Sequence, residues 1–355
     1  MTDDFKLPSP PAKPAPEIAS SSRNFLPALR SFQPRWLSGP MLGLAAVLIL
    51  FGLLLHWKGQ LDTFLSLRNI QVLLHTSSVS AVIALGMLVI ILSGGIDLSV
   101  GSVVALVTVV AMQTYRALEA RNGQGLASVT AVGAGVGVGG LAGLVNGLTI
   151  TRLRVTPFVA TLGMLSVARG LAVWLAHRRT IPFPGTRPGW VDALSRTSSS
   201  RYFFDPGVWS MFALAVLMAL VLRLTVFGRH CYAIGSNETA ARLCGLAVER
   251  TKVCIYVLSG LLTGWAGILV FAQGSGGDPT SSVGLELDVI AAVVIGGASL
   301  SGGQGSVSGT LMGVLILGVL ENGVNLFGVA VEVKYILIGA IVVVNTALSQ
   351  WQKAE

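Results

Sequence analysis

Long apolar runs separated by polar loops are the feature that most restricts how this chain can fold. Six of the ten runs contain no Asp, Glu, Lys or Arg. The runs lie at about 41–55, 70–92, 98–115, 125–150, 156–176, 207–227, 253–273, 286–299, 305–327 and 335–349. A helix of about 20 apolar residues crosses the hydrocarbon core of a bilayer. We therefore predict an all-α polytopic membrane protein with about ten transmembrane helices (eight to ten), some of them short or broken.

Composition excludes the other broad classes of protein. Charged residues make up 11% of the chain and hydrophobic residues 53%, with a mean hydropathy of +0.75. A soluble domain has roughly 25% charged residues, so this chain lacks the polar surface that a soluble protein needs. Its 43 glycines predict closely packed and broken helices, because glycine lets backbones approach one another. The net charge is +8, and most Lys and Arg residues lie in loops and the tail. This distribution is typical of basic loops that set the orientation of a membrane protein, rather than of a nucleic-acid-binding surface.

The ends of the chain predict its orientation. Residues 1–40 contain eight of the 14 prolines and are expected to form a disordered cytoplasmic tail. A transmembrane domain over 41–350 and a short cytoplasmic end, 351–355, follow. Ten spans place both termini on the same side. With the tail inside, 13 of the 24 Lys and Arg residues lie inside and 10 outside. This bias is weak because the longest outer loop, 178–206, alone holds five arginines.

One short motif is a decoy. Residues 300–304 spell LSGGQ, the signature of ATP-binding-cassette ATPase subunits. Such an ATPase also needs a phosphate-binding loop that ends in Gly-Lys-Ser/Thr, and none of the six lysines follows a glycine. The chain therefore has no phosphate-binding loop of this kind, and we expect it not to be an enzyme that hydrolyses ATP. The cysteines and histidines show no metal-ligand spacing, so we expect no metal and no cofactor.

The loop 228–252 is the most informative polar segment. Ser236 or Asn237 is placed to cap a short helix, with Glu238 near the positive end of that helix. Gly245 is placed to end it. Ala240, Ala241, Leu243 and Cys244 form a small apolar face beside Arg242. A capped helix with small apolar residues in a cytoplasmic loop favours docking to another protein, and the alternative is an amphipathic helix that lies on lipid.

Two glycine-broken segments resemble each other. Gly94-Gly95-Ile96-Asp97-Leu98-Ser99 is matched later by residues 296–301, GGASLS. Duplicated halves with broken helices are common in transporters, although chance matches among so many glycines give the same pattern. Asp97 is interpreted as a cap for the next helix, with a role in a gate or a substrate path as the alternative.

Other polar residues within the apolar runs are candidates for a translocation path or gate. Charged groups in a membrane are costly, so Arg169 should be paired or reach the interface, with Glu321 as one possible partner. The complete set of path or gate candidates is Gly94, Gly95, Asp97, Asn146, Gly296, Gly297, Glu321 and Asn322.

Four stretches resemble the permease subunits of bacterial ABC importers for ribose, xylose or autoinducer-2. They are SGGIDLSVGS (93–102), TPFVATLGMLSVARGLA (156–172), the loop 227–252, and residues 286–313 running on to ENGVNLFG (321–328). The resemblance implies that the loop 227–252 contains a coupling helix, which in this family sits in a groove of the ATPase dimer. The matching positions here are Gly235, Asn237, Glu238, Ala241, Arg242 and Gly245. Relatives usually have Gly-Gly-Arg where this chain has Gly302-Gly303-Gln304.

The resemblance also implies the function and the partners. The chain is expected to be the permease of an ATP-driven importer that moves a monosaccharide or small polyol across the bacterial inner membrane. The implied partners are an ABC ATPase subunit or tandem ATPase, a periplasmic sugar-binding protein, a second permease copy (identical or a paralogue) and the lipid bilayer. The alternative is an ion-coupled secondary transporter, in which Asp97 or Glu321 would carry a proton.

Overall fold

The computed structural model describes residues 39–195, 203–328, 336 and 339. In this part of the chain the elements are helices, apart from two strands of two residues each. In chain order they are α1 (Gly39–Trp57), α2 (Leu61–Leu65), α3 (Leu67–Leu92), α4 (Val100–Arg152), α5 (Pro157–Leu175), β1 (Ile181–Pro182), α6 (Gly189–Ser195), α7 (Pro206–Leu224), α8 (Val226–Ser236), α9 (Glu238–Leu243), α10 (Val248–Gln273), β2 (Gly276–Gly277), α11 (Leu285–Ile295) and α12 (Val307–Phe327).

Among the described residues, eight helical stretches are long and apolar enough to span a membrane. Two of them belong to α4, which breaks at Gly123 (φ 76°) into Val100–Arg121 and Gly123–Arg152. The all-α membrane fold is therefore confirmed. The predicted third run, 98–115, is longer than expected, because its helix continues to Arg121.

The predicted eighth span, 286–299, is not a spanning helix. It forms α11, which has 11 residues and is therefore only about 16 Å long, about half of the roughly 30 Å hydrocarbon core. Residues 296–306 then lead to α12 without forming a helix. Residues 1–38 of the predicted tail lie outside the described residues, whereas Gly39 and Pro40 begin α1. All but two residues of the predicted tenth span, 335–349, and the end 351–355 also lie outside them.

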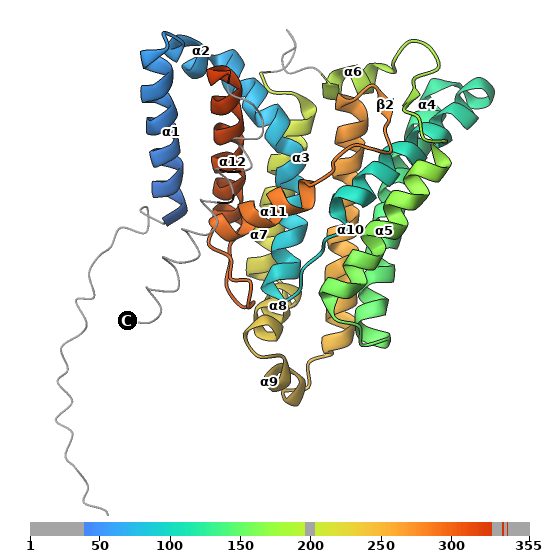
Figure 1. Ribbon diagram of the computed structural model, residues 1–355. Helices are drawn as coiled ribbons and strands as arrows, with labels where there is room; N and C mark the ends of the chain where they lie inside the picture. Colours follow the sequence, from blue (N-terminus) through green and yellow to red (C-terminus); the bar gives the residue numbers. More distant parts are fainter. Residues whose placement is uncertain (1–38, 196–202, 329–335, 337–338, 340–355) are drawn as a thin grey trace, which may run out of the picture. The chain divides into compact units, whose positions relative to one another are not determined.

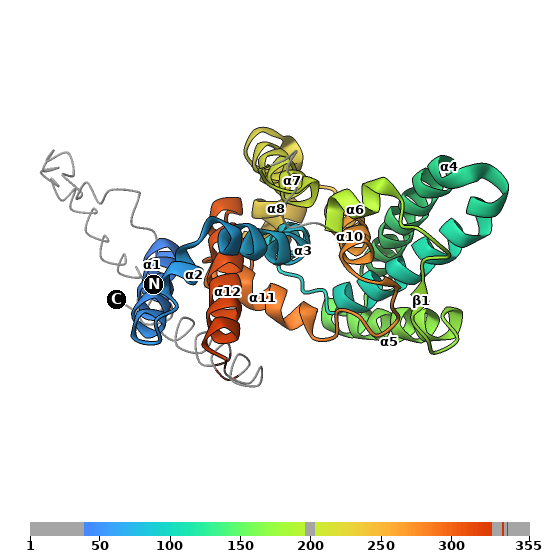
Figure 2. The same cartoon turned by 90° about the horizontal axis from the view of Figure 1, so that it is seen from above.

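The central helix α3 lies between α12 and α10 in both views (Figures 1 and 2). Beyond α12 lies α1, and beyond α10 lie α4 and α5. Figure 1 places α8 and α9 at the lower end of the bundle and α2 and α6 at the upper end. Since α1 leads up to α2, it begins at the same end as α8 and α9.

The described part of the arginine-rich loop that follows α5, residues 178–195, folds onto the upper end of α10 (Figure 1). Within it β1 pairs antiparallel with β2, with Ile181 opposite Gly277. Arg187 donates a hydrogen bond to the carbonyl of Gly274 and lies over the ring of Phe183. These contacts give part of this loop a structural role that its charge pattern did not predict.

A buried pair joins α3 to the start of α7. The ring nitrogen Nδ1 of His75 lies 2.9 Å from Oδ2 of Asp205, and both side chains are buried. The other carboxylate oxygen of Asp205 accepts the backbone N–H of Val208 at 3.1 Å and caps α7. One carboxylate therefore holds both a helix end and a neighbouring helix.

Helices α4 and α10 touch through their backbones. Gly139 and Gly143 on α4 face Gly260 and Gly264 on α10, and both pairs have the four-residue spacing that lets membrane helices approach closely. A Cβ atom on Gly260 would lie 2.3 Å from the carbonyl oxygen of Gly139. The tight packing that the glycine content predicts is present at this crossing.

We predict that Gly260→Ala lowers the thermal stability of the purified protein, because the added methyl group forces the two backbones apart. Overpacking of this kind costs about 1–3 kcal/mol. The matched control is Gly137→Ala on α4, where an added Cβ would meet nothing within 4 Å. Melting in detergent should separate the two variants. Equal melting temperatures for both would contradict the backbone contact.

Candidate functional site

Helix α9 is built by local signals in the loop 228–252. The side chain of Asn237 accepts the backbone N–H of Ala240 at 2.9 Å, so Asn237 caps the helix as expected. At the other end Gly245 takes a left-handed conformation (φ 83°). The N–H groups of Gly245 and Leu246 bond to the carbonyls of Arg242 and Ala241, respectively. Such paired bonds around a glycine close many helices, and Gly245 ends α9 as predicted.

Ion pairs hold α9 against the start of α10. Glu238 accepts a bond from Lys252 at 2.7 Å and one from Arg242 at 3.3 Å. Arg242 also pairs with Glu249, and the hydrogen bond from Arg242 to that carboxylate raises the pKa of the Arg242 guanidinium. Glu238, Arg242 and Glu249 are about half exposed, so each pair contributes little to stability. Together they fix the orientation of a helix that has only six residues.

The predicted apolar face of α9 is divided in two. Ala241 is 6% exposed and packs with Ile234 and Val248 in a small cluster of its own. Leu243, in contrast, is 85% exposed, and Ala240 and Cys244 are also exposed. The inward side therefore anchors the helix, and the outward side presents an unburied leucine at the end of the bundle.

The expected coupling residues do not all lie on that outward side. Asn237, Arg242 and Gly245 are exposed, and Glu238 is half-buried. Ala241 faces inward, and Gly235 lies at the end of α8 against other backbone segments. The exposed Leu243 was not among the expected coupling residues, although the sequence placed it beside Arg242.

Asp97 lies in the break between α3 and α4 and is buried. Its Oδ1 accepts the backbone N–H and the hydroxyl of Ser99 at 2.8 and 2.6 Å. The cap position of α4 is Ser99 itself, whose side chain makes no capping bond. The capping interpretation is therefore corrected: Asp97 stabilises the turn just before the helix, two residues upstream of the cap.

Asn146 joins the same buried cluster from the far half of α4. Its amide donates to Ser99 Oγ at 3.1 Å and, at 3.5 Å, to Asp97 Oδ2. Tyr256 on α10 donates to the carbonyl of Ile96 at 3.4 Å. The break is thus held by α4 and α10, and the structure brings Gly94, Gly95, Asp97 and Asn146 into one place.

The remaining path candidates lie elsewhere. Gly296 ends α11 and packs against the backbone of Gly309 on α12, and Gly297 follows it in a left-handed conformation. Asn322 exchanges two amide hydrogen bonds with Asn69 at 2.9 and 2.8 Å. Asn322 therefore connects α12 to the start of α3 through these two hydrogen bonds. Sequence reasoning did not identify Asn69 as its partner, because the two residues are far apart along the chain.

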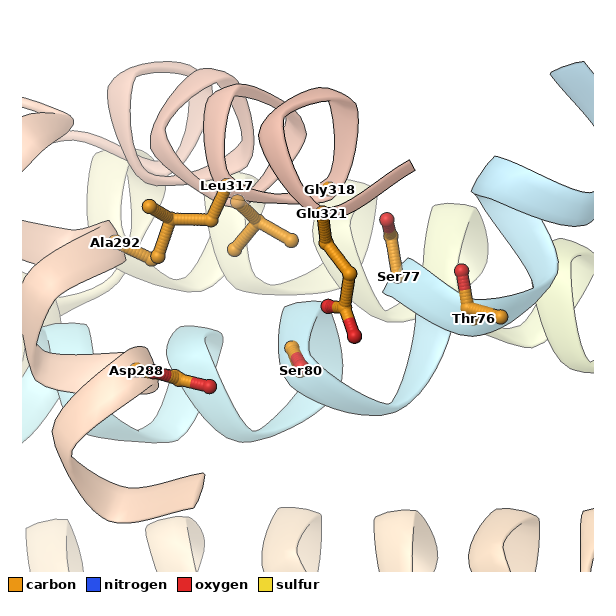
Figure 3. A pocket seen from close by; sticks show the side chains of 9 residues that line it. Thr76, Ser77, Ser80, Asp288, Ala292, Leu317, Gly318 and Glu321 are labelled. Carbon is orange, nitrogen blue, oxygen red and sulfur yellow. The ribbon is translucent and has the colours of Figure 1, made fainter. Parts of the chain in front are cut away.

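Glu321 borders a polar pocket between α3, α11 and α12. Figure 3 shows the carboxylates of Asp288 and Glu321 directed toward Ser80 from opposite sides. Thr76 and Ser77 also line the pocket. Thr76 and Glu321 are exposed, so the pocket opens on the surface of this chain.

Arg169 on α5 has different neighbours from those expected. Its Nη1 donates to the carbonyls of Pro279 and Ser281 at 2.7 and 3.0 Å. The carboxylates that attract its guanidinium electrostatically are those of Glu286 and Asp278, and not the expected Glu321. The guanidinium thus binds the segment that leads into α11. Within the described part of the chain no group of His, Cys, Asp and Glu residues is arranged to hold a metal ion.

Comparison with known proteins assigns the family. The sequence family described as the permease component of the branched-chain amino acid transport system matches residues 69–346. The chain belongs to this permease family. It is therefore a multi-pass inner-membrane transport subunit and not an enzyme. In an ABC importer, a permease works with an ATPase and a substrate-binding protein.

Several relatives are similar over most of this permease. The ribose import permease protein of Bacillus subtilis is 38% identical over 89% of this chain and 93% of that protein. The L-arabinose ABC transporter permease protein of Azospirillum brasilense is 37% identical over 82% and 83%, respectively. The fructose import permease protein of Rhizobium meliloti is 33% identical over 88% and 84%. No solved structure matches this chain.

We predict that Asn237→Ala loosens α9 without unfolding the permease. Loss of an N-cap costs about 1 kcal/mol, and the ion pairs and the Ala241 cluster continue to hold the helix to the bundle. Hydrogen exchange across residues 238–243 should accelerate, whereas the melting temperature stays close to that of the wild type. Asn237→Ser keeps a capping oxygen and should keep the slow exchange. Equally fast exchange in both variants would contradict the cap.

Proposed function

We propose that this permease moves a neutral monosaccharide or small polyol through the inner membrane in an ATP-driven importer. The observation that carries the proposal is its similarity to the ribose, arabinose and fructose permeases over more than four-fifths of its length. The family assignment favours this function over an ion-coupled secondary transporter, which the sequence had left open.

The polar pocket supports a neutral polyhydroxy substrate. Two carboxylates and three hydroxyl groups border it, and no Lys, Arg or His is among its described lining residues. Carboxylates accept hydrogen bonds from sugar hydroxyls, but they repel the carboxylate of an amino acid or a sugar acid. We therefore infer that Glu321 belongs to the translocation path. The opening of the pocket on the chain's surface supports a path that a second permease copy completes.

The other path candidates support the helix breaks on which a gate depends. Gly94, Gly95, Asp97 and Asn146 shape the entrance to α4, and Gly296 and Gly297 shape the turn after α11. Asn322 holds α12 in register with α3 through Asn69. In this proposal they set the positions of the helices around the path rather than contact the sugar.

The outward side of α9 is the proposed contact with the ATPase. Asn237, Arg242 and Leu243 are exposed there, with Glu238 and Gly245 holding the helix in shape. Its end of the bundle also carries the start of α1 and the loop between α4 and α5 (Figure 1). We propose that this end is cytoplasmic, as the Lys and Arg distribution favours. We also propose that both chain termini lie in the cytoplasm.

The transport test uses proteoliposomes that contain the permease, its ATPase and its binding protein. Radiolabelled ribose, L-arabinose, fructose and leucine are offered in turn. We expect ATP-dependent uptake of at least one sugar and no uptake of leucine. Sugar uptake that continues without ATP and stops when the proton gradient is collapsed would support the secondary transporter instead.

The docking surface is tested by Leu243→Asp. Placing a charge at the centre of a protein contact typically costs more than 2 kcal/mol, so retention of the ATPase during purification should fall by about tenfold or more. Leu65→Asp, an exposed leucine at the opposite end, is the matched control and should retain the ATPase. Normal retention in the Leu243 variant would exclude α9 as the contact.

Orientation is tested by labelling Cys244 with a membrane-impermeant maleimide. Cys244 is exposed, whereas burial raises the pKa of the Cys231 thiol to about 12 and keeps it unreactive. In a Cys254→Ser background, we expect labelling in inside-out vesicles and none in intact cells. Leu65→Cys in a background without Cys244 and Cys254 should behave in the opposite way. Labelling of Cys244 from outside would reverse the orientation.

A further inference from the structure

Three segments that are distant in sequence meet at the end of α8. They are the C-terminal end of α3 with the glycines that follow it, the last turn of α8, and the loop 301–305 before α12. The backbone N–H of Gly303 donates to the carbonyl of Leu92 at 2.9 Å. The hydroxyl of Tyr232 on α8 donates to the carbonyl of Gly305 at 3.0 Å. The two glycine-broken segments are therefore joined to each other and to α8.

At Gly235 the backbone of α8 comes closest to the other two segments of this junction. A Cβ atom there would lie 1.8 Å from the carbonyl oxygen of Leu92 and 2.5 Å from the amide nitrogen of Gly303. From the other side, a Cβ on Gly302 would lie 2.8 Å from the carbonyl oxygen of Gly235. Backbone touches backbone on both sides, so no flexible side chain is present to absorb a shift of α8.

The junction is joined tightly to α9. Only Asn237 separates α8 from α9, and its N–H bonds back to the carbonyl of Ala233. Ile234 on α8 packs against Ala241 on α9 and Val248 on α10. A force applied to the outward side of α9 therefore reaches Gly235 through a short, hydrogen-bonded and packed connection.

The two segments that Gly235 touches each lead to a functional part of the bundle. Residues 93–99 carry the Asp97 turn and lead into α4, which also supplies Asn146. Residues 296–306 lead into α12, which supplies Glu321 to the polar pocket. A displacement of α8 therefore acts on the starts of α4 and α12 together.

We propose that Gly235 is a positioning residue that passes the movement of α9 to both helix breaks, and that it does not itself bind the ATPase. This inference rests on the proposed function, because it assumes that α9 docks to an ATPase. It assigns separate roles to two residues that the resemblance places in one motif: Asn237 supports docking, and Gly235 transmits the movement.

The experiment compares Gly235→Ala with wild type in proteoliposomes that contain the ATPase, the binding protein and a sugar that the wild type imports. The added methyl group must separate Leu92 from Gly303. We expect the ATPase to co-purify normally and to hydrolyse ATP at close to the wild-type rate. Sugar imported per ATP hydrolysed should fall by about tenfold, within the usual range of coupling effects. Gly137→Ala is the control and should import normally.

A second measurement follows the junction directly. In the wild-type complex, hydrogen exchange across residues 301–305 should change when ATP binds to the partner, and in Gly235→Ala this response should be absent. Tyr232→Phe adds no atoms and removes only the bond to Gly305. It should lower import per ATP by about twofold or more, which tests the proposal even when Gly235→Ala folds poorly.

The outcomes separate this proposal from the one on which it rests. Failure of the wild-type complex to import with ATP would contradict the proposed function. Loss of the ATPase from Gly235→Ala, to the same extent as from Leu243→Asp, would assign Gly235 to the docking surface and overturn the inference. Normal import per ATP in a folded Gly235→Ala protein, or in Tyr232→Phe, would overturn it as well.

Discussion

Helices α4 and α10 cross with their backbones in contact, and the arrangement of the functional parts depends on this crossing. The glycines at 139, 143, 260 and 264 remove the side chains that would otherwise separate the two helices. In a membrane there is no hydrophobic force to drive apolar helices together, so close van der Waals contact has to hold them. The contact also brings Asn146 and Tyr256 to the same side of the α3–α4 break, where both make hydrogen bonds.

A broken helix inside a membrane needs polar partners from its neighbours, because its free backbone groups have no access to water. The two breaks in this chain obtain them in different ways. The break at 93–99 uses side chains: Asp97, Ser99 and Asn146 form a buried cluster. The loop 297–305 relies largely on backbone groups, with Gly303 bound to Leu92 and Gln304 bound to Ser299. The two segments are therefore similar in sequence but are stabilised by different hydrogen bonds.

Local patterns predicted the local structure well. Apolar length located eight spans, and the Asn237 and Gly245 signals located the ends of α9, because both depend on neighbouring residues only. The failures concern contacts between distant residues. Apolar content alone did not show that α11 is too short to span, since the chain leaves the helix at Gly296, where it packs on Gly309. The sequence also did not predict the partners of Arg169 and Asn322. Those contacts depend on how each helix is rotated and how far it is shifted along its neighbour, which local patterns do not specify.

The LSGGQ segment shows why context decides the meaning of a motif. In an ATPase the residues of this motif contact a nucleotide. In this chain Gly302 and Gly303 take left-handed conformations and pack against α8. The contacts use backbone atoms, and the side chain of Gln304 is exposed. The side chain of Gln304 therefore belongs to the surface of the loop and not to the junction. The glycines are the part of the motif that the fold requires, since a side chain at Gly302 would press on the backbone of Gly235 and one at Gly303 would press on Ser236.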